Sequence, residues 1–268
     1  MKIVAVANQK GGVGKTTTAV NLASCLAEKN LKTLLIDLDP QANATSGLGM
    51  EVTNGLSVYG PLLGHASISD KVLPTRFENL FIIPADLDLV GAEIEVARLE
   101  DHIMCLRTAM QPLLSDSAFD YVILDCPPSL GILMSNALVA SDELIIPIQC
   151  EYYALEGLSK IVHVIEQIKT IGANPALRIG GILMTMFIAR TNLSQQVMEE
   201  VRKHFGTAVF NTVIPRTIRL GEAPSFGKPI IEYDPNGPGA AAYRNLASEY
   251  LALVPTEQVA MVQEEMAE

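Results

Sequence analysis

The sequence predicts an α/β fold: a doubly wound, mostly parallel sheet with helices on both faces. Short apolar runs alternate with longer amphipathic stretches along most of the 268 residues. The short runs are continuously apolar, which is typical of strands that helices cover on both faces. The stretches between them are long enough for helical crossovers between parallel strands. Hydrophobic residues make up 49% of the chain and charged residues 18%, so a sizeable core is possible and global disorder is excluded.

The strands and helices are expected in alternation. The first predicted helix, residues 14–29, has Ala19, Leu22, Ala23 and Leu26 at helical spacing. The predicted strands are residues 3–7, 33–36, 80–83, 121–124, 143–148 and 179–184. The other predicted helices are residues 87–98, 102–115, 130–140, 154–171, 193–205 and 239–253.

Two segments depart from this alternation. Residues 40–79 are rich in Gly, Ser, Thr and Asn, so we expect them to be the least regular and a candidate mobile segment. Residues 255–268 are acidic and are expected to form a frayed helix end. No internal repeat or linker interrupts the rest, which predicts one domain over residues 1–254 followed by the acidic tail.

The sequence shows no signal for export or membrane insertion. The apolar run after Lys2 reaches Lys10 too soon for a signal peptide, and no run approaches the roughly 20 apolar residues of a membrane span. The cysteines, Cys25, Cys105, Cys126 and Cys150, are widely separated and form no metal-binding or disulfide pattern. We therefore expect a soluble cytoplasmic protein with reduced cysteines.

A glycine-rich turn separates the first predicted strand from the first predicted helix. It reads Lys10-Gly11-Gly12-Val13-Gly14-Lys15-Thr16-Thr17. Glycines let backbone N–H groups surround a phosphate, and the helix that follows directs its positive N-terminus at the same anion. In such a loop Lys15 reaches the β- and γ-phosphates and the Thr16 hydroxyl binds Mg²⁺. The turn predicts a phosphate-binding loop, although Gln9 stands where the general pattern has its first glycine.

Carboxylates follow two of the predicted strands. Asp37 and Asp39 stand at the end of residues 33–36, and Asp125 follows residues 121–124. The carboxyl ends of parallel strands form the edge at which ligands bind, and a period of two places Asp37 and Asp39 on one side. Carboxylates there can hold Mg²⁺ directly or through water. Phosphoryl transfer needs mainly positioning and charge neutralisation, so these few groups are sufficient for it.

The loop from Lys10 to Thr17 resembles the deviant Walker A motif of the ParA/MinD family of dimeric P-loop ATPases. Three further segments are similar to the Soj branch of that family over about residues 1–253: DPQANATSGL from Asp39, QCEYYALEG from Gln149 and VIPRTIRLGEAPSFGKP from Val213. The resemblance implies a Mg²⁺-dependent ATPase that is slow without its activator and serves chromosome or plasmid partitioning. Its ATP-bound sandwich dimer would bind non-specific DNA on the nucleoid, and a ParB-like partner would stimulate hydrolysis and release it.

The resemblance also implies roles for single residues. Lys10 would cross the dimer interface to the partner's nucleotide, Asp39 would orient the attacking water, and Asp37 would support the switch segment that follows it. The catalytic residues are then Lys10, Lys15 and Asp39, and the Mg²⁺ residues are Thr16, Asp125 and Asp39. The nucleotide-binding residues are Lys10, Gly11, Gly12, Val13, Gly14, Lys15, Thr16, Thr17 and Pro215.

The charge distribution leaves DNA binding open. The formal net charge is −11, but residues 160–244 carry a net +4. By resemblance, Arg190 and Arg219 contact DNA, with Arg216 and Lys228 as weaker candidates. The residues before Arg190 are Ile188 and Ala189, where the family usually has an acid. Non-specific binding requires a few cations aimed at phosphates, so we expect weak, salt-sensitive binding that depends on dimerisation.

Two alternatives remain open from the sequence. One is a MinD-like positioning ATPase on a membrane, but the last 24 residues contain no Lys or Arg to attract anionic lipid. The other is an interaction module that binds nucleotide with negligible turnover. Asp39 separates this second alternative from the ATPase, because only hydrolysis requires it.

Overall fold

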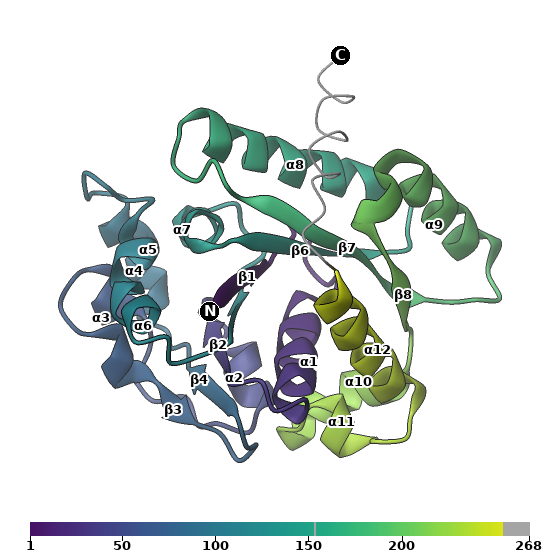
Figure 1. The fold of residues 1–268 in the computed structure, drawn as a ribbon, viewed down its shortest axis with the longest axis horizontal. Coiled ribbons are helices and arrows are strands. Elements are labelled where there is room, and N and C mark those ends of the chain that lie inside the picture. The colour runs from purple at the N-terminus through teal and green to yellow at the C-terminus, as the bar shows by residue number, and fades with distance from the viewer. Residues whose placement is uncertain (153, 254–268) are drawn as a thin grey trace.

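The computed structural model describes residues 1–152 and 154–253, and its described strands form one eight-stranded sheet (Figure 1). The strand order is β3-β4-β2-β5-β1-β6-β7-β8, and every neighbouring pair is parallel except β3 and β4. The strands are β1 (Lys2–Val6), β2 (Thr33–Asp37), β3 (Leu73–Pro74), β4 (Leu80–Ile83), β5 (Tyr121–Asp125), β6 (Glu143–Gln149), β7 (Arg178–Phe187) and β8 (Val209–Pro215). The predicted doubly wound, mostly parallel sheet is confirmed.

Helices cover both faces of the sheet, with α1, α10, α11 and α12 gathered on one face and α7, α8 and α9 on the other (Figure 1). The α-helices are α1 (Lys15–Glu28), α2 (Asn43–Gly47), α3 (Tyr59–Leu62), α4 (Leu89–Val96), α5 (Cys105–Ala109), α6 (Gln111–Ser115), α7 (Ile132–Ala140), α8 (Ala154–Thr170), α9 (Asn192–Phe205), α10 (Ile218–Glu222), α11 (Ile230–Tyr233) and α12 (Pro238–Ala252). Short 3₁₀ turns are η1 (Ile68–Lys71), η2 (Gly206–Ala208) and η3 (Ala223–Phe226).

The central strands are apolar throughout because both of their faces are covered. In β1, Ile3 and Ala5 belong to the core on the α7–α8 side, whereas Val4 and Val6 belong to the core on the α1–α12 side. Successive side chains of a strand point to opposite faces, so an unbroken apolar run fills both cores. No described helix has the length and apolar character needed to cross a bilayer.

The structure corrects the prediction in three places. Residues 102–115 form two short helices, α5 and α6, rather than one, and α6 starts with Pro112 in its first turn, where a proline is tolerated. The strands β3 and β8 were not predicted. Residues 40–79 contain α2, α3, η1 and β3, and bury Leu48, Val58 and Ile68. The predicted frayed tail, residues 255–268, lies outside the described residues.

The sheet places the phosphate loop and the predicted carboxylates at one edge. In the register of β2 and β5, Asp37 is the partner of Asp125, and in that of β1 and β5, Val6 is also the partner of Asp125. These strands therefore end side by side, and the loop after β1 begins beside both carboxylates.

Candidate functional site

The phosphate loop turns sharply before α1. Gly12 and Gly14 have φ angles of +74° and +87°, a left-handed conformation that favours glycine. Gly14 is the N-cap of α1, and no side chain caps the helix. The first N–H groups of α1 are thus left to bind an anion together with the positive end of the helix dipole.

Lys15 lies within this loop and is nearly buried, at 7% exposure. Its Nζ donates a hydrogen bond to the backbone carbonyl of Lys10 at 3.1 Å. Burial lowers the pKa of Lys15, while the nearby carboxylates of Asp125 and Asp39 oppose this effect. The ammonium group is therefore held between the loop and the carboxylates, at the position expected of a phosphate-binding lysine.

Asp125 is fully buried, and neither of its carboxylate oxygens has a hydrogen-bond partner within the described residues. Burial, reinforced by the charge of Asp37, raises the pKa of Asp125 well above its usual range, and the nearby Thr16 side chain partly opposes this rise. A buried carboxylate without a partner is unfavourable in free energy unless a cation or donor accompanies it.

The surroundings of Asp125 fit Mg²⁺ bound together with a nucleotide. Mg²⁺ is usually held by one or two carboxylates, substrate phosphates and water. Asp125 offers carboxylate oxygens, and Thr16, at the start of α1, offers a hydroxyl. Across the described residues, no three His, Cys, Asp or Glu side chains are grouped to hold a metal by themselves. Phosphate oxygens would have to complete such a site.

Asp37 and Asp39 lie at the end of β2, but their environments differ. Asp37 is completely buried and accepts hydrogen bonds from the Thr45 N–H at 2.9 Å and the Thr45 Oγ1 at 2.7 Å. Burial raises the pKa of Asp37 to about 6, although the hydrogen bonds from Thr45 counteract it. Among residues 1–152 and 154–253, the carboxylate of Asp39 accepts one hydrogen bond, from the Gln41 N–H at 2.9 Å. Asp37 thus anchors α2 to the sheet, whereas Asp39 keeps acceptor capacity for a water molecule.

Lys10 is directed to a residue that the sequence did not single out. Its Nζ forms an ion pair with Glu151 Oε2 at 2.7 Å, and its N–H donates to Asn8 Oδ1 at 3.0 Å. Glu151 follows β6 and lies 141 positions after Lys10 in the sequence. The sequence offered no signal for this pair beyond the position of Glu151 in the Soj-like segment from Gln149.

Pro215 and two residues of the phosphate loop, Gly14 and Thr17, line the same cavity. The volume of this cavity is about 200 Å³, and its lining also includes Met186 and Tyr243. The ends of β7 and β8 form its other wall, because Met186 and Pro215 are near their carboxyl ends. A group attached to bound phosphates could extend into this cavity.

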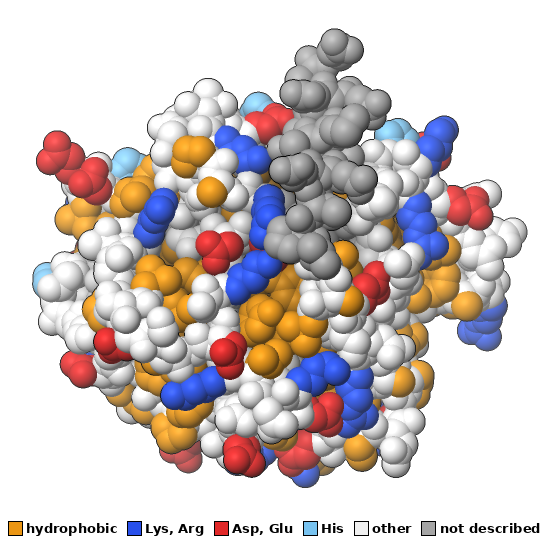
Figure 2. Space-filling view, in the orientation of Figure 1, with side chains coloured by type: hydrophobic (Ala, Val, Ile, Leu, Met, Phe, Trp, Pro, Cys, Tyr) orange, Lys and Arg blue, Asp and Glu red, His pale blue; other side chains and the backbone are white. Residues whose placement is uncertain are grey.

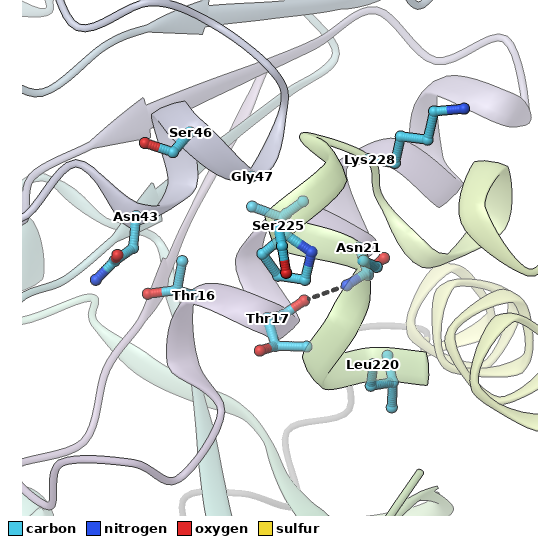
Figure 3. Close-up of a pocket in the computed structure, with 12 residues that line it drawn as sticks. Thr16, Thr17, Asn21, Asn43, Ser46, Gly47, Leu220, Ser225 and Lys228 are labelled. Atoms are coloured by element: carbon cyan, nitrogen blue, oxygen red, sulfur yellow. Dashed lines mark hydrogen bonds between the residues drawn. The ribbon is translucent and has the colours of Figure 1, made fainter. Parts of the chain in front are cut away.

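A second cavity, of about 440 Å³, lies between the start of α1, helix α2 and turn η3 (Figure 3). Its lining includes Thr16, Thr17, Ser46, Ser225 and Lys228. The Lys228 ammonium points away from the two threonines (Figure 3), and it pairs with Glu232 at 3.0 Å. Lys228 therefore lines the cavity beside the start of α1, while its ammonium group forms a partly exposed ion pair.

The four predicted DNA-binding cations fall into two groups. Arg190 and Arg216 line one hollow of about 870 Å³, with no ion pair among the described residues. Arg219 pairs with Glu222 at 3.2 Å, as Lys228 does with Glu232. On the face shown in Figure 2, basic and acidic side chains are interspersed and form no broad basic patch.

Comparison with known proteins gives the family. A family model described as an AAA domain matches residues 1–179. The chain is 52% identical over 252 residues to the sporulation initiation inhibitor protein Soj of Bacillus subtilis, covering 94% of this chain and 98% of that protein. It is 49% identical over 251 residues to the chromosome partitioning protein ParA of Myxococcus xanthus, covering 93% and 88%. The chain belongs to the ParA/Soj family of P-loop ATPases.

A solved structure similar to this ParA/Soj chain contains nucleotide and metal. Cobyrinic acid a,c-diamide synthase from Mycobacterium smegmatis, with bound ADP and magnesium, has a TM-score of 0.80 and 36% identity. The alignment covers 92% of this chain and 93% of that one. The predicted ParA/Soj resemblance and P-loop fold are therefore confirmed, while the roles of single residues stay predictions.

Proposed function

We propose that this ParA/Soj chain is a Mg²⁺-dependent ATPase that partitions chromosomal or plasmid DNA. Its ATP-bound dimer binds DNA non-specifically, and hydrolysis, stimulated by a ParB-like protein, releases it. The relatives named as chromosome partitioning proteins support the process. We also propose that residues 1–254 act as one ATPase domain, located in the cytoplasm on the nucleoid.

The observation that carries the ATPase proposal is the buried Asp125 carboxylate beside the phosphate loop, which accepts no hydrogen bond from the part of the chain that the structure describes. Both oxygens are buried, and the Lys15 ammonium is the nearby positive charge. Binding of Mg²⁺ with a nucleotide would supply the missing positive charge and neutralise charge on the phosphates. The folded protein thus keeps an unfavourable group at the point where MgATP would compensate it.

The remaining residues of the edge have distinct tasks in this proposal. The loop N–H groups and Lys15 bind the phosphates, and Thr16 and Asp125 hold Mg²⁺. Asp39, whose carboxylate accepts a hydrogen bond from the Gln41 N–H, orients the attacking water. Asp37 holds α2 through Thr45 and so links that helix to the reacting edge.

Lys10 supports a role for dimerisation in this cycle. In the single chain its ammonium is paired with Glu151 at 2.7 Å, and both side chains are substantially exposed. An exposed ion pair contributes only about 0–1 kcal/mol, so exchanging Glu151 for a phosphate of a partner's nucleotide is energetically accessible. The dimer would then form only when that nucleotide is present.

The decisive experiment measures DNA binding with ATP, with ADP and without nucleotide, across a salt series. We expect binding with ATP alone, weakening steeply as salt rises, since the contacts are to phosphates. Asp39→Ala should retain ATP-dependent DNA binding and lose about 100-fold or more in ATP hydrolysis. Asp70→Ala, an exposed carboxylate away from the edge, is the control.

Each alternative has its own outcome in that experiment. ATP hydrolysis that stays at background in the wild type, and is therefore unchanged in Asp39→Ala, would favour an interaction module with negligible turnover. ATP-dependent binding to anionic lipid vesicles in place of DNA would favour a membrane-associated positioning ATPase instead.

A further inference from the structure

Two loops that are far apart in the sequence meet backbone to backbone beside the nucleotide edge, the name used here for the phosphate loop and the carboxyl ends of β2 and β5. Gly49 follows α2, and Gly227 follows η3. A Cβ atom on Gly227 would lie 2.6 Å from the Gly49 Cα, so neither loop leaves room for a side chain. The φ angles, +72° at Gly49 and +61° at Gly227, also favour glycine. The contact therefore depends on glycine at both positions for two independent reasons.

Arg76 lies against both loops: a Cβ on Gly49 would be 2.7 Å from its Nη1 atom, and its hydrogen bonds go to Gly227 and Glu232. Its Nε donates to Glu232 Oε2 at 2.9 Å, and its Nη2 donates to the carbonyl oxygen of Gly227. The guanidinium also lies over the Phe77 ring, 5.2 Å from the ring centroid. Because the guanidinium is planar with several fixed donors, one side chain from the loop after β3 can fix both Gly227 and Glu232.

Glu232 connects Arg76 to a predicted DNA-binding cation. One carboxylate oxygen accepts from Arg76, and the other, Oε1, lies 3.0 Å from Lys228 Nζ. Lys228 is therefore neutralised by the same carboxylate that Arg76 holds. A cation paired in this way attracts DNA phosphate less strongly than a free one.

Helix α2, which precedes Gly49, is attached to the nucleotide edge. Helix α2 is held to Asp37 through Thr45, and the Thr45 Oγ1 also accepts from the Ala85 N–H at 3.0 Å. Between α1, α2 and η3 lies the cavity of about 440 Å³ (Figure 3). Because of this hollow, side chains of α1 do not fill the space between α2 and η3. The glycine contact and Arg76 thus add a polar and backbone connection to the apolar core that Ala44 and Leu48 share with Ala223 and Ile230.

We propose that Arg76 is a positioning residue that couples residues 39–50, at the nucleotide edge, to residues 216–233, which carry Arg216, Arg219 and Lys228 of the predicted DNA-binding cations. When MgATP rearranges residues 39–50, Arg76 transmits the movement to Gly227 and Glu232. Glu232 then moves away from Lys228, and the freed ammonium adds to the DNA-binding surface. This inference rests on the proposed function and adds to it a route from ATP to DNA.

The test compares DNA affinity in two nucleotide states. The dissociation constant of the full chain for duplex DNA is measured by fluorescence anisotropy with MgADP and with a non-hydrolysable ATP analogue. The ratio of interest is the constant with MgADP divided by the constant with the ATP analogue. We expect this ratio to be at least fivefold smaller in Arg76→Ala than in the wild type, a change in the range of ordinary allosteric coupling. Binding of the ATP analogue and basal ATPase activity should remain unchanged, because Arg76 bonds neither to the phosphate loop nor to the carboxylates at the ends of β2 and β5.

Two further variants separate geometry from charge. Arg76→Lys keeps the positive charge but cannot bind Gly227 and Glu232 together in the same fork, so the ratio should fall here also. Arg98→Ala removes an exposed arginine elsewhere and should leave the ratio unchanged. Arg76→Lys also decides the question if Arg76→Ala proves too unstable to assay.

The two possible failures are distinguishable. Wild-type protein that binds DNA equally with MgADP and the ATP analogue would overturn the proposed function itself. Wild-type protein that discriminates between them, alongside Arg76→Ala and Arg76→Lys variants with the wild-type ratio, would overturn only the coupling role of Arg76.

Discussion

The nucleotide edge is built differently from the predicted DNA-binding segment, residues 190–228, which contains Arg190, Arg216, Arg219 and Lys228. At the edge, Asp37 and Asp125 are completely buried and Lys15 nearly so. In the segment, Arg190 and Arg219 are exposed, and the ion pair of Arg219 with Glu222 lies in solvent. Charges that are removed from water interact strongly, whereas exposed pairs contribute about 0–1 kcal/mol. Single substitutions at the edge should therefore reduce nucleotide binding or hydrolysis strongly, whereas those in the segment should reduce DNA affinity only slightly.

Substitution of Lys15 should have the largest effect. Lys15→Ala removes a buried ammonium from the phosphate loop, so we expect affinity for ATP to fall about 100-fold or more. Isothermal titration calorimetry below the melting temperature measures this loss. Lys29→Ala, at the exposed C-terminal end of the same helix, is the matched control and should bind ATP normally. Near-normal ATP affinity in Lys15→Ala would show that the edge does not depend on this cation.

The Asp125→Asn variant should separate stability from function. The raised pKa of Asp125 means that the folded state holds this proton more tightly than the unfolded state. The cost in stability therefore grows as the pH rises from the unfolded-state pKa to the raised folded-state pKa, and it disappears below the unfolded-state pKa. Without nucleotide, Asp125→Asn should gain about 1–3 kcal/mol in free energy of unfolding at high pH, and progressively less toward acidic pH.

Denaturant unfolding of both proteins across pH, in the presence of EDTA, measures this difference. Mg²⁺-dependent ATP hydrolysis should be lost in the same variant. A variant that is less stable than wild type at every pH would show that Asp125 is compensated within the fold, contrary to its lack of hydrogen-bond partners.

The same contrast explains how far sequence reasoning reached. The phosphate loop and the two strand ends were predictable because glycine, lysine and aspartate types at fixed spacing determine that edge locally. The pairs Lys10–Glu151 and Arg76–Glu232 were not, since each joins residues more than 140 positions apart. Strand β8 was missed because Asn211 and Thr212 interrupt its apolar run, and their N–H groups bond to Glu249 of α12.

The smallest effects are expected within the DNA-binding segment, and they should differ between Arg190 and Arg219. Arg190 is exposed without an ion pair in the described structure, so Arg190→Ala should weaken binding to all DNA sequences alike and reduce the salt slope by about 1. Arg219 is already bonded to Glu222 and to the Tyr233 hydroxyl. Arg219→Ala should therefore reduce the slope by less than Arg190→Ala does.

DNA affinity measured with the ATP analogue between low and moderate salt gives both slopes. Arg202→Ala removes a half-buried arginine of α9 whose guanidinium donates to the Asn211 carbonyl, and it controls for the loss of one positive charge. Equal slopes in Arg190→Ala and wild type would place Arg190 outside the DNA contact. A larger loss for Arg219 than for Arg190 would mean that DNA displaces Glu222, and that ion pairs of the free protein do not rank these cations.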